Sequence, residues 1–269
     1  MNIVEYNRSA WNKQSSAGSE WCTPVNTATI ARARSGDWRV ILTPTRPVPR
    51  FWFGDLRGKH LLCLASGGGQ QAPVLAAAGA DVVSLDLSEE QLAKDRLVAE
   101  RDNLPLHCVQ GDMADLSAFE DEYFDLVFHP VSNLFIPEVS VVWAGCYRVL
   151  RPGGSLLAGF MNPDYFLFDH EEAQESGTLT VKYRVPYADV QGLEPKLFEK
   201  RLTDGGALEF SHSLEAQIGG QLEAGFVITG FYEDWWLDEA TPLNRFAPTS
   251  MATRALKPPS NISLHPGTP

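Results

Sequence analysis

Between residues 60 and 160 the sequence alternates between short, continuous apolar runs and segments that mix apolar with charged residues. Continuous apolar runs of this length are typical of strands that are covered on both faces, as in a parallel sheet. Most of the intervening segments are long enough to cross over a sheet and start a parallel strand. The predicted strands are HLLCLA (60–65), ADVVSLD (80–86), PLHCVQGD (105–112), EYFDLVFHP (122–130) and SLLAGF (155–160).

The segments between these runs carry helix signals. QAPVLAAAG (71–79) is rich in alanine and ends on glycine, which favours a short helix with a glycine cap. SEEQLAKDRLVAERD (88–102) begins with a capping-box pair, Ser88 and Gln91. Residues 137–150 are also predicted to be helical, just before the turn RPGG and the fifth strand.

The alternation resumes near the C-terminus after an interruption. SLEAQIGGQLEAGF (213–226) predicts a helix, and VITGFYEDWW (227–236) and SMATRALK (250–257) predict a final pair of strands. Strands that alternate with helices predict an α/β fold. We therefore expect a Rossmann-like doubly wound sheet of about seven strands, mostly parallel with one antiparallel strand near its edge.

The interruption divides the chain into predicted parts. Residues 161–210 are rich in aromatic and acidic residues, include the strand-like LTVKYRVPY, and are interpreted as an inserted cap that selects the substrate. Residues 43–50 (TPTRPVPR) have three prolines and predict an extended connector. The predicted parts are an N-terminal arm and connector (1–50), a cofactor-binding half (51–160), the cap (161–210), a C-terminal helix and strand pair (211–257) and a disordered tail (258–269).

Composition narrows the function classes. The 269 residues carry a formal net charge of -12, which argues against nucleic acid as the main partner. No N-terminal apolar segment follows Met1 and no run approaches the ~18 apolar residues of a membrane helix. We therefore expect a cytoplasmic protein with no membrane partner. The cysteines, Cys22, Cys63, Cys108 and Cys146, lack metal-site spacing and are interpreted as core thiols, with no metal site.

The run LLCLASGGGQQ (61–71) is the strongest indication of a binding site. A glycine-rich turn between a buried strand and a helix lies at the edge where doubly wound sheets bind ligands. Asp86 ends the second predicted strand, and Gly111-Asp112 ends the third, so both carboxylates are expected at the same edge. Asp86 could accept hydrogen bonds from two ribose hydroxyls, and Asp112 from an adenine amino group. The pattern therefore predicts a nucleoside cofactor.

More than one cofactor fits this pattern. Gly67-x-Gly69-x-x-Ala72 also matches the dinucleotide fingerprint G-x-G-x-x-A, so an NAD(P)-dependent oxidoreductase is an alternative. Two features count against it. The first is that the first strand starts only near residue 60 while the chain ends with a strand pair in place of a separate catalytic domain. The second is the segment RVLRPGGSLLAGF at 148–160. A non-catalytic nucleoside-binding regulatory module is a third reading.

The segment RVLRPGGSLLAGF (148–160) adds a more specific motif, because it contains a P-G-G turn before the fifth strand. With the glycine loop, Asp86 and Asp112, it makes the chain resemble class I S-adenosylmethionine-dependent methyltransferases over about 51–160 and 226–256. The whole also resembles a group of bacterial methyltransferase-like proteins with the SGGGQQ loop. Cys63 and Ala65 depart from the family pattern, where an acid and a glycine are usual.

The resemblance implies S-adenosylmethionine as the cofactor and methyl transfer to a small-molecule acceptor as the reaction. Residues 65–70 are expected near the methionine end of the cofactor, with Asp86 at the ribose and Asp112 at the adenine. The residues implied to bind the cofactor are Ala65, Ser66, Gly67, Gly68, Gly69, Gln70, Asp86, Leu87, Gln91, Gly111, Asp112, Met113, His129, Pro130 and Val131.

Methyl transfer needs mainly alignment of the acceptor, so the sequence offers no fixed catalytic motif. His129 follows the fourth strand and is interpreted either as a general base or as a wall or hydrogen-bond partner in the cofactor pocket. His212 is read as a helix-start residue or a substrate contact. Trp11 and Trp21 lie in the N-terminal arm, which could close over the cofactor or simply pack against the domain. The aromatic residues of the cap either form a small core or line an acceptor pocket; they are Tyr165, Phe166, Phe168, Tyr183 and Tyr187.

Overall fold

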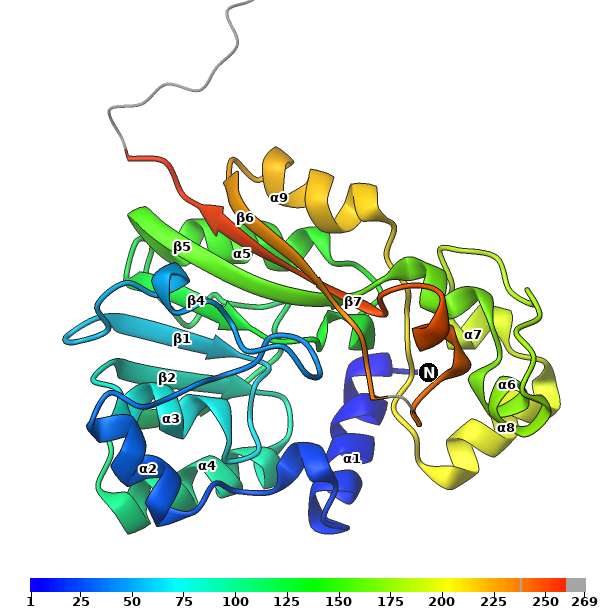
Figure 1. The fold of residues 1–269 in the computed structure, drawn as a ribbon, viewed down its shortest axis with the longest axis horizontal. Coiled ribbons are helices and arrows are strands. Elements are labelled where there is room, and N and C mark those ends of the chain that lie inside the picture. The colour runs from blue at the N-terminus through cyan, green and yellow to red at the C-terminus, as the bar shows by residue number, and fades with distance from the viewer. Residues whose placement is uncertain (238, 260–269) are drawn as a thin grey trace, which may run out of the picture.

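The computed structural model describes residues 1–237 and 239–259, and a seven-stranded sheet forms its centre (Figure 1). The strand order is β3-β2-β1-β4-β5-β7-β6. β1 to β5 run parallel, and β7 lies antiparallel between β5 and β6. This confirms the predicted sheet with one reversed strand near its edge. The strands are β1 (His60–Leu64), β2 (Asp81–Asp86), β3 (Leu106–Gln110), β4 (Phe124–His129), β5 (Leu150–Met161), β6 (Val227–Asp234) and β7 (Ser250–Leu256).

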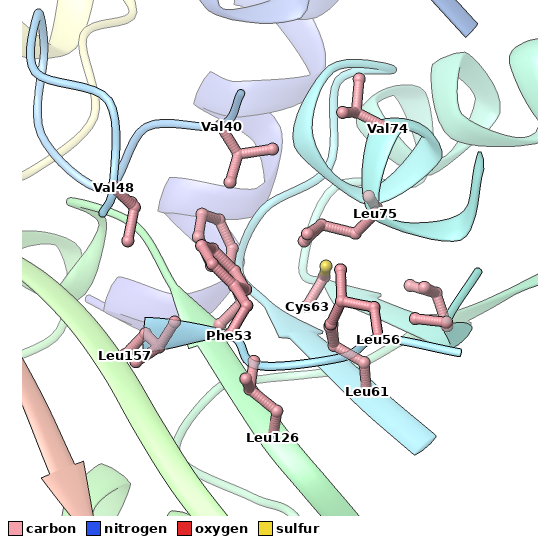
Figure 2. Close-up of a cluster of buried hydrophobic side chains, with 14 of the residues drawn as sticks. Val40, Val48, Phe53, Leu56, Leu61, Cys63, Val74, Leu75, Leu126 and Leu157 are labelled. Carbon is pink, nitrogen blue, oxygen red and sulfur yellow. The ribbon is translucent and has the colours of Figure 1, made fainter. Parts of the chain in front are cut away.

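Both faces of the sheet are covered, which explains the continuous apolar runs. Side chains alternate across a strand, so Leu61 and Cys63 of β1 join one core cluster and Leu62 and Leu64 join another. The first cluster packs against α3 (Figure 2), and the second surrounds the fully buried Trp143 of α5. Helices α2 and α3 contribute to the first cluster and α5 contributes to the second, whereas α4 packs beside β2 and β3. The bounds of these helices are α2 (Thr27–Arg34), α3 (Gln71–Ala77), α4 (Glu89–Asp102) and α5 (Ser140–Val149).

The N-terminal 50 residues contain two different parts. Helix α1 (Ile3–Ser16) and the 3-10 helix η1 (Glu20–Cys22) lie beside the sheet, whereas Val40, Leu42 and Val48 are buried in the core. The predicted extended connector at 43–50 is wrong, because the chain turns back on itself there. Val48 N–H donates to the Val40 carbonyl, and residues 45 and 46 donate to the Asp234 carboxylate, which pins the turn against the end of β6. It is followed by η2 (Arg50–Trp52).

Residues 162–210 fold as short helices packed around a small aromatic cluster. This cap contains Tyr187 and Phe166, whose ring centroids are 5.8 Å apart. The strand predicted in LTVKYRVPY (179–187) is wrong, because the segment forms only one isolated bridge, at Val181. Pro186 has no N–H to donate, and no strand among the described residues lies beside the segment to pair with it. The helical elements are η4 (Pro163–Leu167), α6 (His170–Ser176), α7 (Asp189–Gly192) and α8 (Pro195–Asp204).

The C-terminal part returns to the sheet as predicted. The expected helix at 213–226 is a π-helical turn, η5 (Glu215–Gly219), which continues into α9 (Gly220–Glu223). β6 and β7 follow, with η6 (Pro242–Arg245) between them. The prediction of a disordered tail at 258–269 falls mainly on residues 260–269, which lie outside the described residues.

The cysteines are all free, and Cys22, Cys63 and Cys146 are buried. Within residues 1–237 and 239–259 no group of three or more His, Cys, Asp or Glu side chains is arranged to hold a metal ion. No helix in this part of the chain is both long and apolar enough to cross a bilayer.

Candidate active site

A cavity of about 360 Å³ opens at the carboxyl ends of the central strands. One wall consists of residues that directly follow β1, β2, β3 and β4, and the others come from α1, residues 41–44 and the cap. β1 and β4 are neighbours, whereas the chain runs outward through β2 and β3 before it returns. The cavity therefore lies where the strand order reverses, the usual binding place in a doubly wound sheet.

The structure brings most of the predicted cofactor-binding residues to this cavity. The residues that line it are Ala65, Ser66, Gly67, Gln70, Asp86, Leu87, Gln91, Asp112, Met113, Pro130 and Val131. The predicted positions that are not part of the lining are Gly68, Gly69, Gly111 and His129.

The glycine loop uses its backbone N–H groups within the protein. Gly67 N–H donates to Asp86 Oδ2 over 2.9 Å, and Gly69 N–H donates to Asp95 Oδ1 over 2.7 Å. Gly68 N–H donates to the Gln91 carbonyl over 3.1 Å. A dinucleotide loop instead directs free N–H groups at a pyrophosphate. The paired N–H groups therefore leave no such anion cradle in this loop.

The N-terminal arm explains why glycine is needed at position 68. Gly68 has φ +121°, and a Cβ there would lie 2.6 Å from the Trp21 carbonyl oxygen. At Gly69 a Cβ would lie 2.9 Å from Pro24 Cβ. Gln70 Nε2 also donates to the Glu20 carbonyl, 2.7 Å away. The glycines thus allow the arm to pack directly on the loop.

Asp86 is held in position but retains room for a ligand. Its Oδ1 accepts from Ser88 N–H at 2.9 Å, and its Oδ2 accepts from Gly67 N–H. A carboxylate offers about four lone-pair sites, so about two remain for hydroxyl groups. Burial raises the pKa of Asp86 to about 6, while the backbone N–H donors oppose that rise. The carboxylate can therefore accept further hydrogen bonds from hydroxyl groups of a ligand.

The capping box at the start of α4 forms only by half. Ser88 Oγ accepts from Gln91 N–H at 3.2 Å, as predicted. The reciprocal bond is missing, because Ser88 N–H donates to Asp86 and Gln91 Oε1 accepts from Cys22 Sγ at 3.4 Å. Gln91 thereby links the helix start to the N-terminal arm.

Asp112 follows β3 and lines the same cavity. Its Oδ1 accepts from Ala114 N–H over 2.9 Å, which fixes the direction of the side chain. Its other oxygen accepts no hydrogen bond from the described residues and can receive an amino group. Asp86 and Asp112 thus lie at adjacent strand ends in one cavity.

Asp95, on α4, lies behind the glycine loop and is fully buried. Its carboxylate accepts from Ser84 Oγ over 2.6 Å and from Gly69 N–H. Burial raises its pKa to about 7, above the ordinary value of 3.8. The folded state therefore holds this proton more tightly than the unfolded state.

We expect Asp95→Asn to remove a pH dependence of stability. Because the folded-state pKa is raised, Asp95 makes the free energy of unfolding fall as pH rises from about 4 to about 7. The expected relative gain of the variant at pH 8, compared with pH 4.5, is about 3 kcal/mol. Urea unfolding of both proteins at several pH values measures it, and parallel pH curves would contradict the assignment.

His129 is not placed to act on a ligand in the cavity. Its Nδ1–H donates to the Leu64 carbonyl over 2.9 Å, and its ring packs edge-on against Trp143. The side chain is fully buried, and burial lowers its pKa to about 4. The geometry therefore indicates that His129 links the ends of β4 and β1 and does not transfer a proton. His212 is similarly engaged, since its Nε2 lies 3.0 Å from the Asn133 carbonyl oxygen.

The arm and the cap contribute residues to the cavity lining, and the sequence did not predict that these residues lie together. Trp11 and Trp21 come from the arm, Arg201 and Glu209 from the cap, and Trp236 from the segment after β6. Neither Arg201 nor Glu209 lies in a recognisable sequence motif. A signal for the latter was its isolated charge in the apolar stretch ALEF (207–210).

The sheet order, the reversed strand and the acidic residues at the strand ends define a Rossmann-like, class I methyltransferase. Residues 62–158 match the methyltransferase domain family. The "Uncharacterized methyltransferase YbaJ" of Bacillus subtilis (strain 168) is 49% identical over 255 residues, which cover 95% of this chain and 98% of that protein. The chain belongs to this family of methyltransferases.

Solved structures show the same fold at low sequence identity. An S-adenosylmethionine-dependent methyltransferase from Mesorhizobium loti aligns with TM-score 0.58 and 18% identity, over 77% of this chain and 94% of the other. A Burkholderia thailandensis 1,6-didemethyltoxoflavin-N1-methyltransferase aligns with TM-score 0.57 and 13% identity, over 95% and 88%. The second alignment extends over nearly the whole chain.

Proposed function

We propose that this methyltransferase acts on a small, uncharged acceptor bound between the strand ends, α1 and the cap. The observation that carries the proposal is the charge of the cavity lining. The carboxylates of Asp86, Asp112 and Glu209 line it, and Arg201 is the single Lys or Arg side chain among its described lining residues. Arg201 lies within 4 Å of two carboxylates, so it is not available to balance an anionic ligand.

We infer that the cofactor is S-adenosylmethionine, because the charge of this lining fits it better than it fits the dinucleotide NAD(P). S-adenosylmethionine has a sulfonium, an ammonium and one carboxylate, so it is a net cation at neutral pH. Asp86 would hold its ribose and Asp112 its adenine, and residues 65–70 would lie near its methionine end. When bound, it supplies an activated methyl group. The pyrophosphate of NAD(P) would instead meet several carboxylates and the already paired N–H groups of the glycine loop.

The arm supports a small acceptor over a macromolecular one. Figure 1 shows α1 between the sheet and the cap. Buried Asn7 ties these parts together, since its Nδ2 donates to the carbonyls of Phe135 and Leu208 and its Oδ1 accepts from Leu208 N–H. Trp11 packs edge-on against Phe135 at 5.0 Å between ring centroids. We infer that the arm and the cap enclose the acceptor.

Two similar proteins act on small molecules, in line with this proposal. The Burkholderia enzyme holds 1,6-didemethyltoxoflavin and S-adenosylhomocysteine in its crystal structure. The Acinetobacter baumannii (strain AYE) ubiquinone biosynthesis O-methyltransferase is 30% identical over 118 residues, which cover 43% of this chain and 50% of that protein. We carry over only the size and ring-containing character of the acceptor.

We expect S-adenosylhomocysteine to bind at least about 100-fold more tightly than NADH, because each unfavourable charge placement costs on the order of 1–3 kcal/mol. Isothermal titration calorimetry of the full chain with each ligand measures this ratio. Tighter binding of NADH would overturn the proposed fit of the cavity. Transfer of label from [methyl-14C]S-adenosylmethionine to a panel of neutral metabolites then tests the acceptor class.

A further inference from the structure

Glu209 is the cap residue that best fits the role of a proton acceptor. It follows α8 and lies between the buried residues Leu208 and Phe210. Phe210 forms a bridge with Ala188, and Glu209 N–H donates to Asp189 Oδ2 at 2.9 Å. The backbone is therefore held on both sides of Glu209, while its side chain lines the cavity.

The carboxylate of Glu209 differs from the other carboxylates that line the cavity. Asp86 accepts a backbone N–H at each oxygen, and Asp112 accepts one at Oδ1. Glu209 accepts no hydrogen bond from any described residue. Its ion-pair partner among them is Arg201, with 3.8 Å between Nη1 and Oε1. Both of its oxygens are therefore available to a donor on a bound molecule.

The surroundings of Glu209 bring its pKa close to neutral pH. Burial raises the pKa of Glu209 to about 7; Arg201 of α8 lowers it and Asp189 of α7 raises it. Tyr165 of η4 is also close enough for its own pKa to be raised by the Glu209 charge. Asp189 is occupied otherwise, since its Oδ1 accepts from Tyr187 OH at 2.7 Å. A general base works best with a pKa near the working pH.

We propose that Glu209 is the general base of the methyl transfer, and that the acceptor is a flat, neutral ring compound with an N–H or O–H group directed at Glu209. This inference rests on the proposed function. The acceptor N or O forms a bond to the methyl carbon, the C–S bond breaks and its electron pair stays on sulfur. The proton of the acceptor passes to the Glu209 carboxylate and then to solvent. Arg201 acts as a positioning residue that holds the carboxylate.

The ring character of the acceptor follows from the aromatic side chains that line the cavity. They come from segments far apart in the sequence, yet Tyr165 stacks on Trp236 at 6.2 Å, and Trp236 packs edge-on against Trp21 at the same distance. Trp11 and Phe135 form another such pair. Aromatic walls with a few polar groups are typical of sites for flat ligands.

The test uses two ligands that differ by the proton in question, 2-naphthol and 2-methoxynaphthalene. Each is titrated into the full chain saturated with S-adenosylhomocysteine at pH 6 and pH 8, below the ionisation of a phenol-type hydroxyl at about 10. Binding is followed by tryptophan fluorescence. The variants are Glu209→Gln and, as a matched control outside the cavity, Glu171→Gln, whose side chain is 81% exposed.

The wild type and Glu171→Gln are expected to bind 2-naphthol about 5-fold more tightly at pH 8 than at pH 6, because the ionised carboxylate is the better acceptor. This gain should be absent for 2-methoxynaphthalene and in Glu209→Gln. Labelled transfer from S-adenosylmethionine to 2-naphthol should fall at least about 100-fold in Glu209→Gln, with unchanged affinity for S-adenosylhomocysteine.

Several outcomes would overturn the inference without touching the proposed function. They are failure of 2-naphthol to bind or to be methylated, equal pH dependence for both ligands, and an unchanged transfer rate in Glu209→Gln. Failure of S-adenosylhomocysteine itself to bind the wild type would instead overturn the assigned cofactor site.

Discussion

Replacing Asp86 with alanine is expected to weaken binding of S-adenosylmethionine by about 10–100-fold. The carboxylate keeps about two lone-pair sites free after accepting from Gly67 N–H and Ser88 N–H. Loss of hydrogen bonds to a charged acceptor costs ~1–3 kcal/mol, and each 1.4 kcal/mol is tenfold in affinity. Calorimetric titration with S-adenosylmethionine and S-adenosylhomocysteine measures the change.

Two further variants separate ligand contacts from damage to the loop. Asp86→Asn keeps one acceptor oxygen and should lose less affinity than Asp86→Ala. Asp81→Ala removes an exposed carboxylate from the opposite end of the same strand and should leave affinity unchanged. An unaltered dissociation constant in Asp86→Ala would refute the placement of the ribose at β2.

The sheet could be predicted because its signal is local. Burial on both faces makes each central strand a continuous apolar run, and the segments between the strands carry their own caps, such as Ser88. The wrong prediction of an extended connector concerns a segment whose structure depends on a remote partner. The turn at 43–50 is pinned by Asp234, which lies nearly 190 residues away, and no sequence neighbour reports that contact.

The same distinction applies to the site. Asp86 and Asp112 could be predicted because the ends of neighbouring parallel strands meet at one edge of the sheet. The direction in which a side chain points at a strand end could not be predicted. His129 is therefore expected at the cavity from the sequence, whereas in the structure its ring packs against Trp143. Glu209 could not be predicted either, because it reaches the cavity only through the folding of the cap back over the strand ends.

The glycine triplet has a role within the protein itself, in addition to the predicted approach of a ligand. The sequence suggested close approach of backbone to a ligand, and Gly67 does line the cavity. At Gly68, however, the neighbour is the Trp21 carbonyl of the chain's own arm. The loop therefore couples the cofactor site to the arm, and the two parts of the cavity depend on each other.

Gly159→Ala is expected to lower the free energy of unfolding by about 3 kcal/mol or more and to disturb the cavity at the same time. A Cβ at this position in β5 would lie 2.2 Å from the Leu42 carbonyl oxygen and 2.8 Å from its carbonyl carbon. The Cβ position is fixed by the backbone of β5 and its neighbour is a backbone carbonyl, so neither can rotate away. Overpacking of a core typically costs 1–3 kcal/mol even where side chains can adjust.

The damage should reach the ligand because the Leu42 carbonyl also accepts from Val131 N–H at 2.9 Å, and both residues line the cavity. Displacing Leu42 breaks this bond and shifts the wall on which the proposed reaction depends. Urea unfolding and S-adenosylhomocysteine titration of the same sample measure the two effects.

Gly219→Ala is the matched control, since its Cβ would meet only Glu215 Cγ at 3.7 Å. The free energy of unfolding of this variant should be unchanged or higher by up to ~1 kcal/mol. Wild-type stability in Gly159→Ala would mean that the backbone of residues 41–43 can move without cost, and the cavity wall would then be a flexible one.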